Sequence, residues 1–270
     1  MSSPRETYTH GHHESVLRAH RWRTAANSAA YLLPSLRPEM TLLDVGCGPG
    51  TVTLDFARLV DRGSVVGVDR EEAPLAEART LAAGTPNVSF AVGDVYALDF
   101  ADASFDVVHA HQLLQHLTDP VSALAEMSRV CRPGGLVAAR DADYATMSWH
   151  PAEPALDLWL ELYHAVARAN RAEPDAGRQL LGWAHAAGLS DVTASASAWC
   201  FATPADREWW GGAWAERATS SAFAEQALAY GLATREQLAE VAAGFRRWVG
   251  SDDGWFAMIH GEIVCRTSRT

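Results

Sequence analysis

Apolar and polar residues in the first part of the chain predict strands and helices that follow one another in turn. Leu42–Val45 is a short apolar run that ends in glycines, and apolar residues then recur at helical spacing over Thr51–Val60. The same alternation predicts strands over 64–68 and 88–92 with a helix over 72–83 between them. Strand–helix–strand order predicts a parallel sheet with right-handed crossovers and helices on both faces.

The second half of the chain continues this plan and adds a long insertion. Its apolar runs predict strands over 105–110, 136–140, 191–199 and 255–265, and helices over 120–131 and 175–187. Residues 204–249 have mostly helical character, and this stretch of about 50 residues is far longer than an ordinary connection. We expect a doubly wound, Rossmann-like α/β fold with a seven-stranded, mostly parallel sheet and a helical cap inserted before the last strand.

The charged residues of the chain exclude some classes of partner and cofactor. The formal charge is −11, with 33 acidic and 22 basic residues, which does not suit a surface that neutralises nucleic-acid phosphates. All 22 basic residues are arginine, so no lysine can form a Schiff base with pyridoxal phosphate. We therefore expect no nucleic-acid partner and a small molecule as the substrate.

The cysteines and the N-terminus bear on compartment and metal content. Cys47, Cys131, Cys200 and Cys265 are far apart and form no Cys-x-x-Cys pair, as expected of free thiols in a reducing compartment. The chain has no apolar leader and no run of roughly 18 apolar residues. The N-terminal histidines lack the acids and cysteines of a zinc site. We expect a cytoplasmic protein with no membrane span and no metal, and a homodimer is one option for its assembly.

A glycine cluster marks the junction of the first strand and the first helix. Asp44-Val45-Gly46-Cys47-Gly48-Pro49-Gly50 needs glycine where the chain turns sharply and where a ligand lies against the backbone. Dinucleotide folds use G-x-G-x-x-G for pyrophosphate, whereas this turn has G-x-G-x-G preceded by an acid. The Asp44 carboxylate would repel pyrophosphate but suits an ammonium group. A cofactor that is cationic at this end is favoured over a nicotinamide dinucleotide, and a tight turn without ligand stays as the alternative.

Two further acids follow the next two strands. Asp69 can accept hydrogen bonds from both hydroxyls of a ribose, or it can cap the helix that follows. Asp94, with the backbone N–H of Val95, can hold an adenine, or it can stabilise a turn. Because the carboxyl ends of parallel strands meet at one edge of a sheet, Asp44, Asp69 and Asp94 are expected to converge on one crevice.

These motifs together carry a family resemblance. Leu42 to Thr51, Val68-Asp69, Gly93-Asp94, Phe105 to Leu117 and Arg129 to Leu136 resemble the successive motifs of class I S-adenosylmethionine-dependent methyltransferases. The resemblance is greatest to the small-molecule branch typified by ubiquinone and menaquinone biosynthesis methyltransferases. It covers residues 40 to 140 strongly, and beyond Asp141 only the general plan of the fold matches.

The resemblance implies S-adenosylmethionine as the cofactor. Its methionine part would lie along Gly46, Gly48 and Gly50, its ribose at Asp69, and its adenine at Asp94 and Val95. The cofactor-binding residues expected on this basis are Tyr8, Arg23, Asp44, Gly46, Gly48, Gly50, Asp69, Arg70, Gly93, Asp94, Val95, Ala110, His111 and Gln112.

The resemblance also implies that the N-terminal segment folds over the cofactor as a lid. Tyr8, His13 and Arg23 would then face the crevice, and surface roles are their alternative. His111, just past the fourth strand, is our candidate general base or acceptor-positioning group, because neutral imidazole can take a proton near pH 7. Packing beneath the cofactor is its alternative. The expected catalytic residues are His111, His13 and Tyr8.

The acceptor is expected to occupy an apolar, large pocket closed by the cap. The residues expected there are His116, Trp149, Trp209, Trp210 and Trp214, with Trp149 in the loop after the fifth strand. A packing position is the alternative for His116, and the core is the alternative for the tryptophans.

The expected activity is methyl transfer from S-adenosylmethionine to an oxygen or carbon of a hydrophobic small molecule, either natural-product-like or quinone-like. The alternatives are a cyclase or sensor that binds the cofactor without methylation, and a nicotinamide oxidoreductase. Four segments are expected: a helical lid over 1–38 with its helix from Glu14 to Leu33, the core over 39–200, the cap over 201–250, and the last strand over 251–270.

Overall fold

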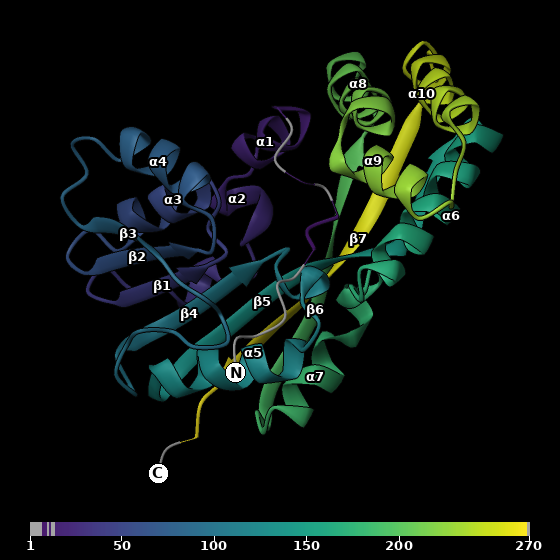
Figure 1. The fold of residues 1–270 in the computed structure, drawn as a ribbon. Helices are drawn as coiled ribbons and strands as arrows, with labels where there is room; N and C mark the ends of the chain where they lie inside the picture. Colours follow the sequence, from purple (N-terminus) through teal and green to yellow (C-terminus); the bar gives the residue numbers. More distant parts are fainter. Residues whose placement is uncertain (1–6, 10, 12–13, 269–270) are drawn as a thin grey trace.

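The computed structural model describes residues 7–9, 11 and 14–268, and a seven-stranded sheet runs through them in the order β3-β2-β1-β4-β5-β7-β6 (Figure 1). Neighbours from β3 to β5 pair in parallel, whereas β7 runs antiparallel to both β5 and β6. The predicted seven-stranded, mostly parallel Rossmann-like sheet is therefore confirmed. The strands are β1 Thr41–Val45, β2 Ser64–Asp69, β3 Val88–Val92, β4 Phe105–His111, β5 Cys131–His150, β6 Asp191–Phe201 and β7 Trp255–Arg266.

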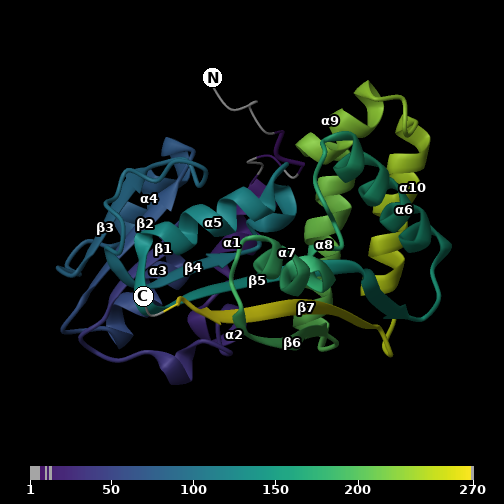
Figure 2. The same cartoon turned by 90° about the horizontal axis from the view of Figure 1, so that it is seen from below.

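Helices cover both faces of this sheet. Figure 1 shows α3 and α4 on one face and α5 and α7 on the other, and Figure 2 shows the second face from below. The α-helices are α1 Glu14–Arg21, α2 Ala25–Ser28, α3 Thr51–Leu59, α4 Glu72–Leu81, α5 Pro120–Val130, α6 Pro154–Ala169, α7 Leu180–Ala186, α8 Pro204–Ser220, α9 Ala222–Ala229 and α10 Arg235–Val249. Short 3₁₀ turns are η1 Leu33–Ser35, η2 Leu114–His116 and η3 Ala176–Gln179.

Apolar side chains on the two faces of the central strands fix this arrangement. Leu42 of β1 packs with Phe56 of α3 on one face, and Leu43 packs with Leu124 of α5 on the other. Each of these side chains is fully buried, and full burial of one such side chain stabilises the fold by roughly 1.5–3 kcal/mol. Strand alternation therefore locks the central strands between two helical layers and leaves their carboxyl ends facing one edge.

The N-terminal helix is shorter than predicted. The expected helix from Glu14 to Leu33 is wrong, because α1 ends at Arg21 and a new helix begins after Thr24. The Thr24 hydroxyl accepts the N–H of Asn27, and the Asn27 side chain accepts the N–H of Thr24. This reciprocal cap starts α2 and forces a bend that brings Arg23 to the sheet edge.

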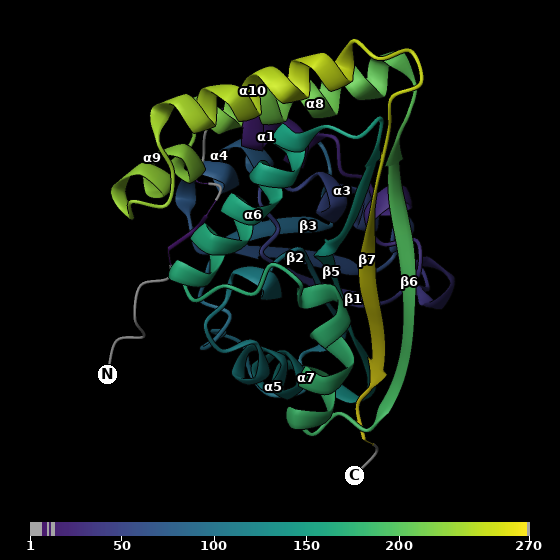
Figure 3. The same cartoon turned by 90° about the vertical axis from the view of Figure 1, so that its right-hand side faces the viewer.

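The fifth strand and the helix after it also differ from expectation. β5 continues to His150 and pairs with β7 along its length, so Trp149 lies in a strand and not in a loop. Helix α6 follows it and was not predicted. It packs against α9 and α10 of the insertion, and Figure 3 shows α8 and α10 side by side at the end of the long strands. The cap is therefore a four-helix layer whose first helix precedes β6.

The cap has its own aromatic core. Trp159 of α6 lies 4.5 Å from Trp214 and 5.1 Å from Phe245, between ring centroids, and all three side chains are fully buried.

Among the described residues, no helix is long and apolar enough to cross a membrane.

Candidate functional site

A cavity of about 650 Å³ opens at the carboxyl ends of β1, β2, β3 and β4. The three expected acids converge there, as parallel strand order requires. The cavity wall includes these residues expected from the sequence: Tyr8, Arg23, Asp44, Gly46, Gly48, Asp69, Arg70, Gly93, Asp94, Val95, His111, Gln112 and His116.

The two glycines Gly48 and Gly50 of the turn have different surroundings: Gly48 borders the cavity, and Gly50 packs against neighbouring side chains. Gly48 has φ +53°, and a Cβ added there would meet only the His20 ring nitrogen, at 3.7 Å, so the space beside it belongs to the cavity. Gly50 is not part of the wall. At φ +77°, its added Cβ would lie 2.8 Å from the ring of Phe90 and 2.9 Å from Ala78, so glycine is needed there for packing at the start of α3.

Asp44 is held by two neighbours inside the protein. Its Oδ1 lies 2.8 Å from Nδ1 of His109, and its Oδ2 accepts the hydroxyl of Thr53 at 2.6 Å. Asp44 is 3% exposed and His109 is fully buried. His109 was not among the site residues expected from the sequence. It lies two residues after Val107 on β4 and shares a face of the strand with it, which could have placed it beside Asp44.

Asp69 joins the end of β2 to the glycine turn. Its carboxylate accepts the backbone N–H of Gly48 at 2.9 Å and the backbone N–H of Glu71 at 3.0 Å. Each carboxylate oxygen can accept a second hydrogen bond, so a ribose hydroxyl and the backbone can share the group. The Asp69 carboxylate thus sets the position of the loop that borders the cavity.

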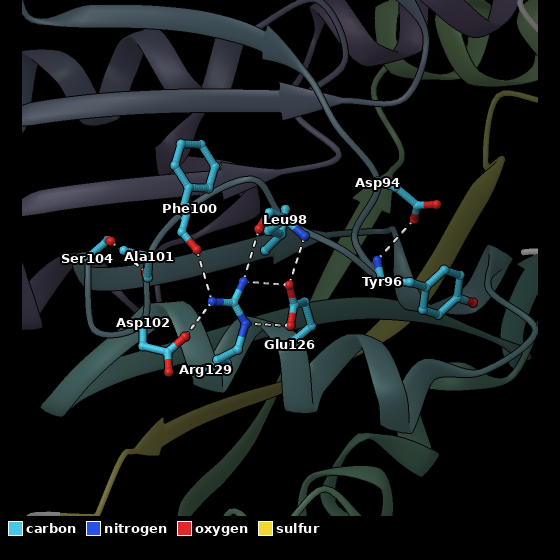
Figure 4. Close-up of polar contacts among 9 residues, drawn as sticks. All are labelled: Asp94, Tyr96, Leu98, Phe100, Ala101, Asp102, Ser104, Glu126 and Arg129. Atoms are coloured by element: carbon cyan, nitrogen blue, oxygen red, sulfur yellow. Dashed lines mark hydrogen bonds and ion pairs between the residues drawn. The ribbon is translucent and has the colours of Figure 1, made fainter. Parts of the chain in front are cut away.

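The loop after Asp94 is fixed to α5 (Figure 4). Asp94 accepts the N–H of Tyr96 at 3.0 Å, and the guanidinium of Arg129 donates to the carbonyls of Leu98 and Phe100, both at 2.9 Å. Arg129 also pairs with Glu126, which keeps the pKa of that carboxyl below its usual range. The Arg129 side chain therefore holds in place the loop that follows Asp94.

The N-terminal segment lies across the cavity. Tyr8 contacts the ring of His116 edge-on at 4.8 Å, and its hydroxyl lies 3.3 Å from Nε2 of His20. Its carbonyl accepts the side-chain N–H of Gln226 in α9 at 3.2 Å. The guanidinium of Arg23 donates to Gln112 at 2.5 Å. The segment therefore connects the cap to the sheet edge, while His13 lies outside the described residues.

Burial shifts the ionisation of these groups toward their neutral forms. It raises the pKa of Tyr8 to about 12, lowers that of Arg23 to about 10 and lowers that of His116 to about 3. Near pH 7, Tyr8 is therefore a neutral phenol, His116 is a neutral imidazole and Arg23 keeps its positive charge.

His111 is a buried polar group on the cavity wall. It is 6% exposed, and within the described part of the chain neither ring nitrogen has a hydrogen-bond partner. Burial, followed by the charges of Arg23 and Arg140, holds its pKa well below the usual value. A neutral imidazole offers one donor and one acceptor, so His111 can donate one hydrogen bond and accept another.

Several expected site residues lie elsewhere. Ala110 is fully buried in the apolar layer beneath the sheet. Trp210 and Trp214 are buried in the cap's aromatic core, and Trp149 and Trp209 pack against that core. None of these four tryptophans lines the cavity. Trp210 and Trp214 are four residues apart and share the face of α8 that packs against the cap interior.

Comparisons with known proteins agree on the family. A family model described as a methyltransferase domain matches residues 36–193. An uncharacterised methyltransferase of Schizosaccharomyces pombe is 37% identical over 279 residues, which cover 98% of each chain. A demethylmenaquinone methyltransferase of Beutenbergia cavernae is 33% identical over 156 residues, which cover 57% of this chain and 60% of that protein.

A solved structure has a similar fold. The phosphoethanolamine N-methyltransferase 2 of Haemonchus contortus, determined with phosphomonomethylethanolamine and S-adenosylhomocysteine, gives a TM-score of 0.54 at 18% identity, covering 86% of this chain and 50% of that one. The family model spans more than half of the chain, and the Schizosaccharomyces pombe relative matches it over nearly its full length. The chain therefore belongs to the S-adenosylmethionine-dependent methyltransferases.

Proposed function

We propose that the chain transfers the methyl group of S-adenosylmethionine to an oxygen or carbon atom of a hydrophobic small molecule, either quinone-like or natural-product-like. The observation that carries this proposal is His111, a buried and neutral imidazole that lines the cofactor cavity with both ring nitrogens unpartnered in the described chain. The similarity to a demethylmenaquinone methyltransferase supports a quinone-like acceptor.

The cavity fits the cofactor on chemical grounds. Gly48 leaves open space on its cavity side, which suits a ligand lying against the backbone. The carboxylates of Asp69 and Asp94 border the cavity, where they would accept hydrogen bonds from ribose hydroxyls and an adenine amino group. Asp44 adds negative charge for the ammonium of the methionine part. When bound, S-adenosylmethionine supplies a methyl group activated by the positive charge on its sulfur.

Arg23 is assigned the α-carboxylate of the cofactor. In the described part of the chain, Arg23 pairs with no carboxylate and its Nε has no hydrogen-bond partner. A buried guanidinium at a cavity wall binds an anion readily, and carboxylate is the group that arginine recognises with two parallel hydrogen bonds.

His111 and Tyr8 are assigned to the acceptor. The lowered pKa of His111 makes it a hydrogen-bond acceptor that orients a hydroxyl, and a weak base. In-line orientation and exclusion of water are the main demands of methyl transfer from sulfonium, since the leaving group is already good. Tyr8 and His116 would close the acceptor side, and the proton of the acceptor leaves to His111 or to solvent.

The division into lid, core, cap and last strand stays part of the proposal. Residues 1–38 would act as a lid because Tyr8, His20 and Arg23 border the cavity. Deletion of the residues before Glu14 is expected to lower turnover more than it lowers the melting temperature. A truncated enzyme with normal turnover would remove Tyr8 and His13 from the site.

Methyl transfer tests the function directly. The chain is incubated with methyl-labelled S-adenosylmethionine and a panel of reduced quinones and phenols, and products are identified by a mass gain of one methyl. We expect a labelled product from at least one acceptor and a loss of at least tenfold in turnover for His111→Ala. His111→Asn, which keeps a donor and an acceptor, should lose less. Tight cofactor binding with no labelled product would favour the cyclase or sensor alternative.

A further inference from the structure

Gln112 connects the N-terminal segment to the last strand. It follows β4 directly, with φ +50°, and its backbone N–H donates to the carbonyl of Arg140 at 2.7 Å. Its side-chain oxygen lies 2.5 Å from the guanidinium of Arg23, and its side-chain nitrogen lies 2.8 Å from Nε2 of His260. Gln112 borders the cavity, whereas His260 on β7 is fully buried behind it.

The donors and acceptors in this chain of hydrogen bonds can be assigned in only one way. Arginine only donates, so the Gln112 atom that faces Arg23 must be the amide oxygen. The amide nitrogen then faces His260, and because an amide nitrogen only donates, Nε2 of His260 must accept. The imidazole of His260 is therefore neutral, with its proton on Nδ1.

The surroundings of His260 favour this neutral form. Burial, followed by the charges of Arg140 and Arg23, holds its pKa well below the usual value. Arg140 itself pairs with Glu262 on the same strand as His260. The ring of Trp199 packs against the imidazole of His260, with 4.3 Å between the ring centroids.

The position of Arg23 depends on this connection. Its guanidinium donates a hydrogen bond to Gln112, and no carboxylate in the described chain pairs with it. Gln112 in turn is fixed at both ends of its amide. Without an acceptor at position 260, the amide of Gln112 would be held at one end only, by Arg23 itself, and would no longer fix the position of the guanidinium.

We propose that His260 is a positioning residue for cofactor binding: through Gln112, it holds the guanidinium of Arg23 where it receives the cofactor's α-carboxylate. This inference rests on the proposed function, which assigns that carboxylate to Arg23. His260 lies outside residues 36–193, which match the family model, so under this proposal the C-terminal strand contributes to the site from beyond the matched part.

Calorimetry with two ligands tests the proposal. S-adenosylhomocysteine carries the α-carboxylate, whereas 5′-methylthioadenosine lacks the whole amino-acid end. His260→Phe keeps an aromatic ring but removes the acceptor, and His260→Gln supplies an oxygen acceptor instead. We expect His260→Phe to weaken S-adenosylhomocysteine about tenfold while 5′-methylthioadenosine is unchanged, and His260→Gln to recover most of the loss.

Two further comparisons extend the test, and the first of them leaves position 260 unchanged. Gln112→Met should produce the same selective loss, and Arg23→Ala combined with His260→Phe should be no worse than Arg23→Ala alone. Equal weakening of both ligands, no weakening in the His260→Phe and Gln112→Met variants, or full additivity with Arg23→Ala would overturn the proposal. Failure of the unmodified protein to bind S-adenosylhomocysteine would instead overturn the proposed function.

Discussion

Nδ1 of His109 on β4 lies 2.8 Å from Oδ1 of Asp44 on β1, and both side chains are almost completely buried. The two residues are direct partners in the parallel register of these strands. A carboxylate at 3% exposure is costly unless its oxygens are bonded, and His109 with Thr53 meets that need. The acid that borders the cavity is thus held by the core beneath it.

Removal of His109 should destabilise the fold. His109→Phe keeps the edge-on ring contact with Phe56 at 5.0 Å but leaves Oδ1 of Asp44 without its partner. We expect a loss of roughly 1–3 kcal/mol in the free energy of unfolding, measured by urea denaturation. Thr53→Ser keeps the hydroxyl and serves as the control. A His109→Phe protein within about 0.5 kcal/mol of the unmodified one would contradict the pairing.

Gly48 and Gly50 should respond differently to alanine. Gly48→Ala places a methyl group in the cavity, so S-adenosylhomocysteine should bind at least tenfold more weakly, while the left-handed backbone costs about 1–2 kcal/mol of stability. Gly50→Ala carries the same backbone cost and also drives a methyl group against Phe90, so its stability should fall further. Calorimetry and thermal unfolding on both variants separate the two roles. Normal ligand affinity in Gly48→Ala would show that no ligand lies against this turn.

Asp141 should make stability fall as the pH rises. Burial raises its pKa from 3.8 to about 7, so between these values the folded protein keeps a proton that the unfolded chain releases. Its contribution to stability is therefore present below about pH 4 and is lost progressively up to about pH 7, to a total of up to about 4 kcal/mol.

Asp141→Asn isolates this effect from the buried histidines. The difference in unfolding free energy between the variant and the unmodified protein should move in favour of the variant between pH 4 and pH 7, measured by urea denaturation at several pH values. A difference that stays constant over this range would show that Asp141 is ionised in the folded protein.

Periodicity and strand-end acids were enough to predict the sheet, its parallel core and the crevice. They succeed because strands buried on both faces, such as β1 and β4, are continuous apolar runs in the sequence. Parallel topology then brings Asp44, Asp69 and Asp94 to the carboxyl edge of the sheet. The insertion before β7 was visible for a similar reason, since its helical spacing is strong and no ordinary connection is so long.

Features decided by distant contacts were not visible in the sequence. Helix α6 becomes part of the cap only because α10, far along the chain, packs against it. The sequence leaves both a pocket and a core open for Trp210, and the ring of Phe201, stacked on it at 4.6 Å, belongs to the core. His260 acquires a role only in the folded sheet, where β7 lies two strands from β4 and Gln112 links His260 to Arg23.

The most direct measurement of the central claim is calorimetric titration of the full chain with S-adenosylhomocysteine, beside NADH and the Asp69→Ala variant. The account predicts a single site with a dissociation constant in the micromolar range, typical of a cofactor that is exchanged at each turnover. It also predicts at least tenfold weaker binding in Asp69→Ala, because charge-assisted ribose hydrogen bonds and the anchor of Gly48 are lost together. Unchanged affinity in Asp69→Ala, or NADH binding as tight as that of S-adenosylhomocysteine, would contradict it.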